Sequence, residues 1–228
     1  MNTKEKIDDC IDVLKKDFEL HLNKEKARQM KAYMKNHFDF YGIQSPLRKS
    51  IQKSWLDALK SVEPTLKWDI IHALFAQKER EFQLVAIDWL NKSPKKNIQE
   101  TDIEHIEKLL LTKSWWDSVD AIASNFVGTW AKHFPQSAQN IIQKWRYSDN
   151  IWLQRTCLIF QLKYKNETNV ALLEDLIAQL HPNKTFFIQK AIGWTLRELS
   201  KTNPEETERI LCTYPIVGLA KREASKYL

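Results

Sequence analysis

The stretch Ser114–Asp120, SWWDSVD, begins a predicted helix that covers residues 114–133. Ser114 is followed three residues later by Asp117, a spacing typical of a variant capping box whose side chains serve the free amides of the first turn. At helical spacing an apolar stripe then faces the core: Trp115, Val119, Ile122 and Phe126. Trp116 and Asp120, four residues apart, share the neighbouring face and place an indole beside a carboxylate. That pair is either a core tryptophan beside a solvated aspartate or part of a site.

Amphipathic helices of this kind fill the rest of the chain. The predicted helices span residues 3–21, 24–36, 47–60, 64–77, 79–92, 98–111, 114–133, 136–146, 150–164, 168–180, 184–200, 204–213 and 216–227. Asn23, Asp149 and Asn203 precede such runs and are predicted to cap them. The chain contains only 4 glycines and lacks the alternating pattern of strands. These features predict an all-α protein.

Pairs of predicted helices recur at a spacing of roughly 35 to 45 residues, which is typical of HEAT-like repeats. Stacked antiparallel pairs form a solenoid whose inner helices line a concave groove. We therefore expect residues 1–228 to form a single HEAT-like repeat domain with a positively charged groove. Because no crisp identity relates the units, a compact helical bundle is the alternative.

The charge balance favours a polyanionic partner. The formal net charge is +6 and the isoelectric point is near 9.1, and a surplus of cations attracts phosphates. A basic but merely solvated surface would give the same balance.

Cysteine and histidine usage indicates no disulfide framework and no metal site. The 3 cysteines are single and odd in number, which suits a reducing compartment. The 6 histidines stand alone, without zinc-ligand spacing. No apolar run approaches the ~20 residues of a membrane span, and the amino terminus is too polar for a secretory signal. We expect an intracellular, cytoplasmic protein that is monomeric, because no dimerisation segment is visible.

A second helix, within residues 184–200, repeats the pairing of tryptophan with charge. Lys190, Trp194, Arg197 and Lys201 fall on one face, opposite the apolar residues Ile188, Ile192, Leu196 and Leu199. This face is either a solvated basic stripe or a surface that tracks phosphates and stacks on bases.

Arg155 interrupts an apolar face that includes Leu158 and Leu162. Its guanidinium must therefore either extend to solvent or meet an anion. A ligand phosphate would satisfy it with two parallel hydrogen bonds.

Most enzyme classes lack support in the sequence. There is no GxSxG elbow, no phosphate-binding glycine loop and no HExxH motif. Glycoside cleavage usually requires two carboxyl groups. A purine alkylated on a ring nitrogen is already cationic, however, and leaves as a neutral base, so one carboxylate suffices. Asp120 could then stabilise the developing sugar cation and orient water, with Trp116 and Trp194 enclosing the sugar.

The chain resembles the AlkD-type DNA glycosylases of the DNA alkylation repair family over nearly its whole length. The segments that carry the resemblance are Tyr33-Met34-Lys35, Gly42-Ile43-Gln44-Ser45-Pro46-Leu47-Arg48, Ser114–Asp120, Arg155-Thr156, Phe187–Glu198 and Arg222-Glu223-Ala224.

The resemblance implies removal of cationic N3- and N7-alkylated purines from double-stranded DNA while the lesion stays in the duplex, without metal or cofactor. It also implies that Asp120 is catalytic, that Trp116 and Trp194 contact the sugar, and that Arg155 contacts a phosphate. Further DNA contacts are expected from the implied family positions and the basic stripe: Tyr33, Gln44, Lys163, Lys190 and Arg197. Two other functions remain open at this point: a non-catalytic binder of branched or distorted DNA, and a scaffold for an acidic protein.

Overall fold

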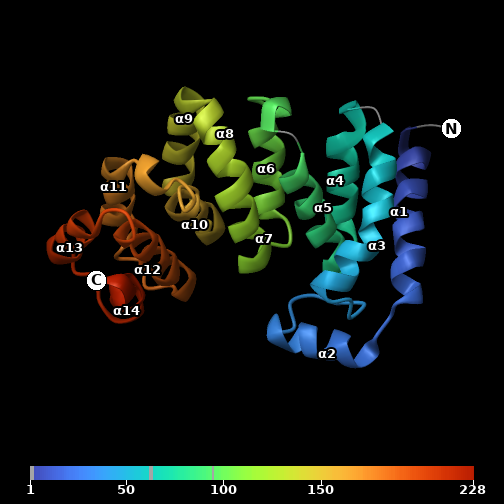
Figure 1. Ribbon diagram of the computed structural model, residues 1–228, viewed down its shortest axis with the longest axis horizontal. Helices are drawn as coiled ribbons and strands as arrows, with labels where there is room; N and C mark the ends of the chain where they lie inside the picture. Colours follow the sequence, from blue (N-terminus) through green and yellow to red (C-terminus); the bar gives the residue numbers. More distant parts are fainter. Residues whose placement is uncertain (1–2, 62–63, 94) are drawn as a thin grey trace. The chain divides into compact units, whose positions relative to one another are not determined.

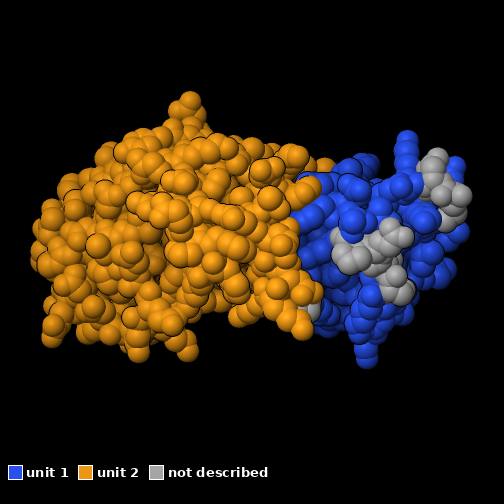
Figure 2. Space-filling model, turned by 90° about the horizontal axis from the view of Figure 1, so that it is seen from above, with its two compact units in different colours: residues 1–93 blue, residues 94–228 orange. Residues whose placement is uncertain are grey.

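The computed structural model describes residues 3–61, 64–93 and 95–228, and it is all-α over these residues (Figure 1). Within them the only β-type pairing is one isolated bridge between Asp39 and Glu79. The chain divides into two compact units, residues 1–93 and 94–228 (Figure 2). The all-α prediction is confirmed, whereas the single HEAT-like domain and its groove stay predictions.

Unit 1 contains five α-helices in its described residues: α1 (Thr3–Leu20), α2 (Lys24–Tyr33), α3 (Ser45–Ala58), α4 (Lys67–Ala76) and α5 (Arg80–Lys92). Helix α1 packs against α3 and α4, and α5 packs against the same two helices. The fully buried ring of Phe18 contacts Tyr41 and Phe82, with ring centroids 5.8 and 5.3 Å apart. Aromatic and aliphatic burial thus holds four of these helices together.

Helix α2 differs from the others because none of its residues is buried, and Figure 1 shows it set apart from α1, α4 and α5. The loop at Gly42 is hydrogen-bonded to the N-terminal end of α2: the amide of Asn23, the N-cap of α2, donates to the carbonyl of Tyr41 at 2.9 Å. Gly42 has a φ of +87°, and a Cβ there would lie 2.2 Å from the Asn23 carbonyl oxygen. The buried Glu81 carboxylate accepts from the amides of Gly42 and Ile43. The loop therefore requires glycine at position 42.

Unit 2 contains α6 (Asp102–Leu111), α7 (Trp116–Ala121), α8 (Gly128–His133), α9 (Pro135–Arg146), α10 (Ile151–Ile159), α11 (Val170–Leu180), α12 (Phe186–Ser200), α13 (Pro204–Thr213) and α14 (Gly218–Ala224). A π-helical segment, Ile122–Val127, joins α7 to α8. Helix α10 packs against α6, α7, α9, α11 and α12. Both α7, which carries Asp120, and α12, which carries Trp194, therefore pack against α10.

The α12 and α14 helices pack most closely at Gly193. A Cβ built at this position would lie 2.6 Å from the Cβ of Glu223 and 2.8 Å from the carbonyl oxygen of Ala220. The predicted apolar face of α12 is confirmed, since Ile188, Ile192 and Leu196 are fully buried. The missing side chain of Gly193 is what allows α14 to approach this closely.

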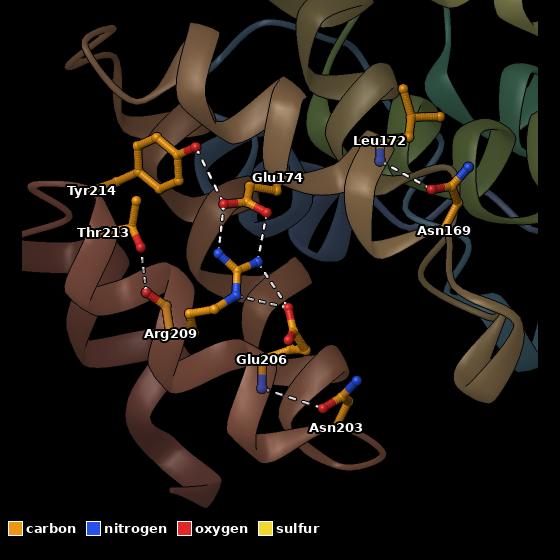
Figure 3. A network of polar contacts seen from close by, with 8 residues as sticks. All are labelled: Asn169, Leu172, Glu174, Asn203, Glu206, Arg209, Thr213 and Tyr214. Carbon is orange, nitrogen blue, oxygen red and sulfur yellow. Dashed lines mark hydrogen bonds and ion pairs between the residues drawn. The ribbon is translucent and has the colours of Figure 1, made fainter.

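Polar side chains link the outer helices α11 and α13 (Figure 3). Arg209 donates to both carboxylate oxygens of Glu174, at 2.9 and 2.6 Å, and also to Glu206. The hydroxyl of Tyr214 donates to Glu174 at 3.3 Å. Because Arg209 is about half exposed, solvent weakens this ion pair and it adds little stability.

The structure confirms two predicted caps and corrects two others. Asn23 accepts from the amide of Lys26, and Asn203 accepts from the amide of Glu206. The cap of α10 is Asn150, whose side chain accepts from the amides of Trp152 and Leu153, so the prediction of Asp149 was wrong by one residue.

The predicted capping box at Ser114 was also wrong. Helix α7 begins one residue later than such a box requires, and its N-cap is Trp115, which makes no side-chain cap hydrogen bond. The hydroxyl of Ser114 donates instead to the carbonyl of Leu110, at the end of α6. The residue therefore serves the free carbonyls of the preceding helix rather than the free amides of α7.

Candidate active site

A buried ion pair between Asp120 of α7 and Arg155 of α10 forms the centre of the candidate site. The Nε of Arg155 donates to Oδ1 of Asp120 at 2.6 Å, and its Nη2 donates to Oδ2 at 2.8 Å. The Asp120 side chain is 15% exposed, and the Arg155 side chain is 3% exposed. Two parallel hydrogen bonds fix the plane of the carboxylate as well as its position. The sequence predicted that Arg155 would extend to solvent or meet an anion, and the anion that it meets in the structure is Asp120.

Burial and the guanidinium act on the pKa of Asp120 in opposite directions. Burial is the largest influence and raises the pKa above its ordinary value, and the nearby charge of Asp117 also raises it. The hydrogen bonds and the positive charge of Arg155 lower the pKa and oppose this effect. Asp120 is thus held as a desolvated carboxylate that depends on its arginine to stay charged.

An aromatic cluster surrounds the arginine of this pair. The rings of Trp115, Trp152 and Phe187 lie with centroids 4.8 to 5.7 Å apart in tilted and edge arrangements. The backbone carbonyl of Phe187 accepts a hydrogen bond from Nη1 of Arg155, and the guanidinium carbon lies 5.9 Å from the Phe187 ring. The start of α12 is therefore hydrogen-bonded to the same arginine that pairs with Asp120.

The π-helical segment begins two residues after Asp120. Ser124 donates to the carbonyl of Asp120 at 2.8 Å, and the amide group of Asn125 donates to the carbonyl of Ala121 at 2.7 Å. Single π-turns of this kind are frequent at functional sites. The side-chain oxygen of Asn125 also accepts from Nζ of Lys163, which is exposed. Lys163 lies in a turn, because α10 ends at Ile159 rather than at the predicted residue 164.

The two tryptophans of the predicted site lie on the helices that α10 supports. Trp116 is the first residue of α7 and shares that helix with Asp120 at a spacing of four, so the predicted common face exists. Trp194 lies on α12, between Lys190 and Arg197 in sequence. Both tryptophans are partly exposed, which is the condition for stacking on a ligand.

The cations on the predicted basic face of α12 are paired. Lys190 and Arg197 both contact Glu223 of α14, at 3.0 and 2.7 Å. Lys201 contacts Glu198, and its Nζ lies 5.2 Å from the ring of Tyr227. The basic stripe is therefore an ordered set of ion pairs and not a row of independent solvated side chains.

The remaining two predicted DNA contacts lie in unit 1. Tyr33, at the end of α2, is 69% exposed. Gln44 is exposed and is the residue before α3, where its side chain makes no capping hydrogen bond. Both are accessible to a ligand.

Sequence reasoning named Asp120 and Arg155 but missed that they pair, and it assigned no role to Phe187, Asn125 or Glu223. The contacts of Arg155 with Phe187, of Lys163 with Asn125 and of Arg197 with Glu223 join residues at least 26 positions apart in the chain, beyond the reach of helical spacing. The one available signal was Arg155 on an apolar helix face, which required its guanidinium either to extend to solvent or to meet an anion.

Neither a metal-binding cluster nor a membrane-spanning helix occurs among the described residues. No group of three His, Cys, Asp or Glu side chains there could hold a metal ion. None of the helices in that part of the chain combines the length and apolar character needed to cross a bilayer.

Comparisons with known proteins identify the family of the chain. The model of a family of DNA alkylation repair enzymes matches residues 14–228. A solved structure described as a predicted DNA alkylation repair enzyme from Enterococcus faecalis is 36% identical, with a TM-score of 0.84, and the match covers 90% of this chain and 96% of that one. No curated protein is matched. The chain therefore belongs to the DNA alkylation repair enzyme family.

Proposed function

We propose that the protein is a DNA glycosylase that hydrolyses the N-glycosidic bond of cationic N3- and N7-alkylated purines in duplex DNA. The observation that carries this proposal is the buried Asp120 carboxylate, held by Arg155 on the helix that also presents Trp116. The family relationship supports alkylated DNA as the substrate.

The chemistry requires only one carboxylate. An alkyl group on N3 or N7 gives the purine a positive charge, so breaking the glycosidic bond releases a neutral base and needs no general acid. The electrons of that bond leave with the base, and positive charge develops on the deoxyribose. A fixed negative charge beside the sugar stabilises this cation, and a water molecule held by the same carboxylate adds to it and loses a proton to that carboxylate, which returns it to solvent. Opposite charges ~4 Å apart at an effective dielectric of ~20 attract by about 4 kcal/mol, worth roughly three decades of rate.

Arg155 keeps Asp120 ready for this role. Each carboxylate oxygen accepts one hydrogen bond from the guanidinium, and a carboxylate has about four acceptor positions. Two positions therefore remain for water or for the sugar. Because both carboxylate oxygens of Asp120 are fixed before the substrate binds, the site needs no reorganisation to reach the transition state.

The DNA would contact residues of both units. We propose that Trp116 and Trp194 contact the deoxyribose of a lesion that stays in the duplex, and that Arg155, Arg197, Lys163, Lys190, Tyr33 and Gln44 contribute DNA contacts. All three nitrogens of Arg155 already donate, Nε and Nη2 to Asp120 and Nη1 to the Phe187 carbonyl, so a phosphate would contact the one N–H group that remains on each of Nη1 and Nη2. The protein would act as a monomer within the cytoplasm, on a HEAT-like scaffold, without metal or cofactor.

The test is base release from methylated duplex DNA by the wild-type protein and by Asp120→Asn. We expect the wild type to release methylated purines and the variant to release them about a thousandfold more slowly. Because Asn cannot neutralise Arg155, thermal unfolding must show that the variant is folded under the assay conditions. Binding of undamaged duplex should be retained.

Asp175→Asn is the matched control. Asp175 of α11 also pairs with a buried arginine, Arg146, but its side chain is largely exposed and lies in no cluster of tryptophans. This variant should release bases at the wild-type rate. Equal rates for wild type and Asp120→Asn would overturn the proposal, and DNA binding by a wild-type protein that releases no base would favour a non-catalytic binder.

A further inference from the structure

Glu223 of α14 is a buried carboxylate that three cations approach. Lys190 contacts its Oε1 at 3.0 Å, and Arg197 and Lys226 contact its Oε2 at 2.7 and 3.2 Å. The Glu223 side chain is 7% exposed, whereas those of Lys190, Arg197 and Lys226 are 36%, 21% and 49% exposed. The carboxylate therefore lies beneath its three partners, which remain accessible to solvent.

The packing of α14 on α12 holds this carboxylate in place. Gly193 brings the Cβ of Glu223 so close that any side chain at position 193 would collide with it. The hydrogen bond of Lys190 is the main reason that the pKa of Glu223 lies below its ordinary value, with burial opposing it. Leaving a buried carboxylate without partners is costly, so the three cations stay gathered around it.

The cluster retains positive charge after this pairing. One carboxylate faces three cations, which leaves two net positive charges at one place on the surface. An ammonium group has three donors and a guanidinium five, and the contacts to Glu223 use only part of them. The exposed side chains of Lys221 and Arg222 lie on the same helix, α14, as Glu223. The arrangement has the charge and the free donors that an external anion requires.

We propose that Lys190, Arg197 and Lys226 form a preorganised site for a backbone phosphate of duplex DNA, with Glu223 as the positioning residue beneath it. Trp194, between Lys190 and Arg197 on α12, supplies the aromatic surface that favours nucleic acid over an acidic protein. The inference rests on the proposed function for the identity of the ligand, and not for any step of base release. It adds Lys226 and Glu223 to the expected binding surface.

The first test is the salt dependence of binding to an undamaged DNA duplex, measured by fluorescence anisotropy. For each phosphate contact that is lost, the slope of log affinity against log salt falls by about 0.9. We expect Lys226→Gln to reduce the slope by about this amount and to weaken binding roughly fivefold to tenfold at ~0.1 M salt. Lys144→Gln, which removes an exposed lysine paired with Glu107 in the same unit, should leave the slope unchanged. Equal slopes for Lys226→Gln and the wild type would overturn the site.

The second test asks whether Glu223→Gln tightens or weakens binding to the DNA duplex. If Glu223 mattered only through its charge, its removal would make the protein more positive and tighten DNA binding. If it positions the cations, binding should weaken despite the added positive charge. Glu208→Gln, which removes an exposed carboxylate of α13 in the same unit, measures the charge effect alone. Tighter binding by a folded Glu223→Gln variant would refute the positioning role, and if that variant does not fold, Lys226→Gln decides.

Base release separates this inference from the proposed function. A wild-type protein that binds duplex and shows the expected loss in Lys226→Gln, but releases no methylated base, would leave the phosphate site standing and defeat the glycosylase proposal. The opposite result, base release with no effect of Lys226→Gln on binding, would defeat the phosphate site alone.

Discussion

Asp120 illustrates how one side chain can be both costly to bury and useful to keep. Burial favours its neutral form, and the paired arginine favours its charged form. A fully solvated aspartate would be charged without help, but water would then screen its interaction with a sugar cation. The pair keeps Asp120 charged in a setting where water screens it less than at the surface, but this makes the charge depend on Arg155.

This dependence predicts the acid limb of the pH profile. If Asp120 stabilises the sugar cation as proposed, base release requires its ionised form, so the rate should fall as the pH drops through its pKa. Because that pKa is raised, the fall should begin at a higher pH than for an ordinary aspartate. Arg155→Gln removes the lowering influence and should shift the midpoint further up, whereas Asp117→Asn removes a raising influence and should shift it down. Single-turnover base release, corrected for spontaneous depurination at each pH, measures the midpoints. A midpoint that Arg155→Gln does not move would show that the pair does not control the rate.

The sequence singled out residues of the candidate site but not their contacts. Asp120 and Arg155 stood out because a carboxylate beside an indole and an arginine on an apolar face both need a reason to be there. Their pairing could not be derived, because it depends on how α7 lies on α10, and helical periodicity is silent on the packing of one helix against another. The same limit explains why no role could be predicted for Glu223 from the sequence.

At the scale of elements, the 3.6-residue pattern located the helices well, and the ends of α1, α5 and α13 agree with the prediction within about a residue or two. It failed where local geometry departs from the regular helix. The predicted helix 114–133 contains the π-helical segment Ile122–Val127, whose extra residue per turn leaves no mark on an apolar pattern of three or four turns. The pattern also misplaced the helix start at Ser114. The Ser114 hydroxyl can bond either to the end of α6 or to the start of α7, and in the structure it bonds to α6.

Gly193 makes the contact between α12 and α14 testable. We expect Gly193→Ala to destabilise unit 2 by about 1–3 kcal/mol, because the new methyl group meets Glu223 and the Ala220 backbone and overpacks the interface. Gly218→Ala is the matched control: its φ of +59° strains an alanine, but no atom lies within 4 Å of the added Cβ. Only Gly193→Ala should also lower amide protection along α14 in hydrogen exchange. Unchanged protection of α14 in Gly193→Ala would contradict the close packing.

At the scale of the whole molecule, the net charge of +6 predicted a polyanionic partner without showing where the charge gathers. The structure places one concentration on α14 and α12 of unit 2. A second lies on α2 of unit 1, a helix without buried residues that carries Lys24, Lys26, Arg28 and Lys31 against one carboxylate, Glu25. Composition could not reveal this, because the acidic residues of α1 in the same unit offset part of this charge in any average.

If both units contact one duplex, their contributions to the salt dependence of binding should add. We expect Lys26→Gln with Arg28→Gln on α2 to reduce the slope of log affinity against log salt by about 1 to 2, since each lost phosphate contact contributes about 0.9. Combining these changes with Lys226→Gln should reduce it by the sum of the separate effects. Lys15→Gln with Lys16→Gln, on the exposed face of α1, removes the same charge from the same unit and should have a smaller effect. Equal slope changes for the α1 and α2 variants would mean that net charge alone attracts DNA. An unchanged slope in the α2 variant would remove unit 1, with Tyr33 and Gln44, from the DNA interface.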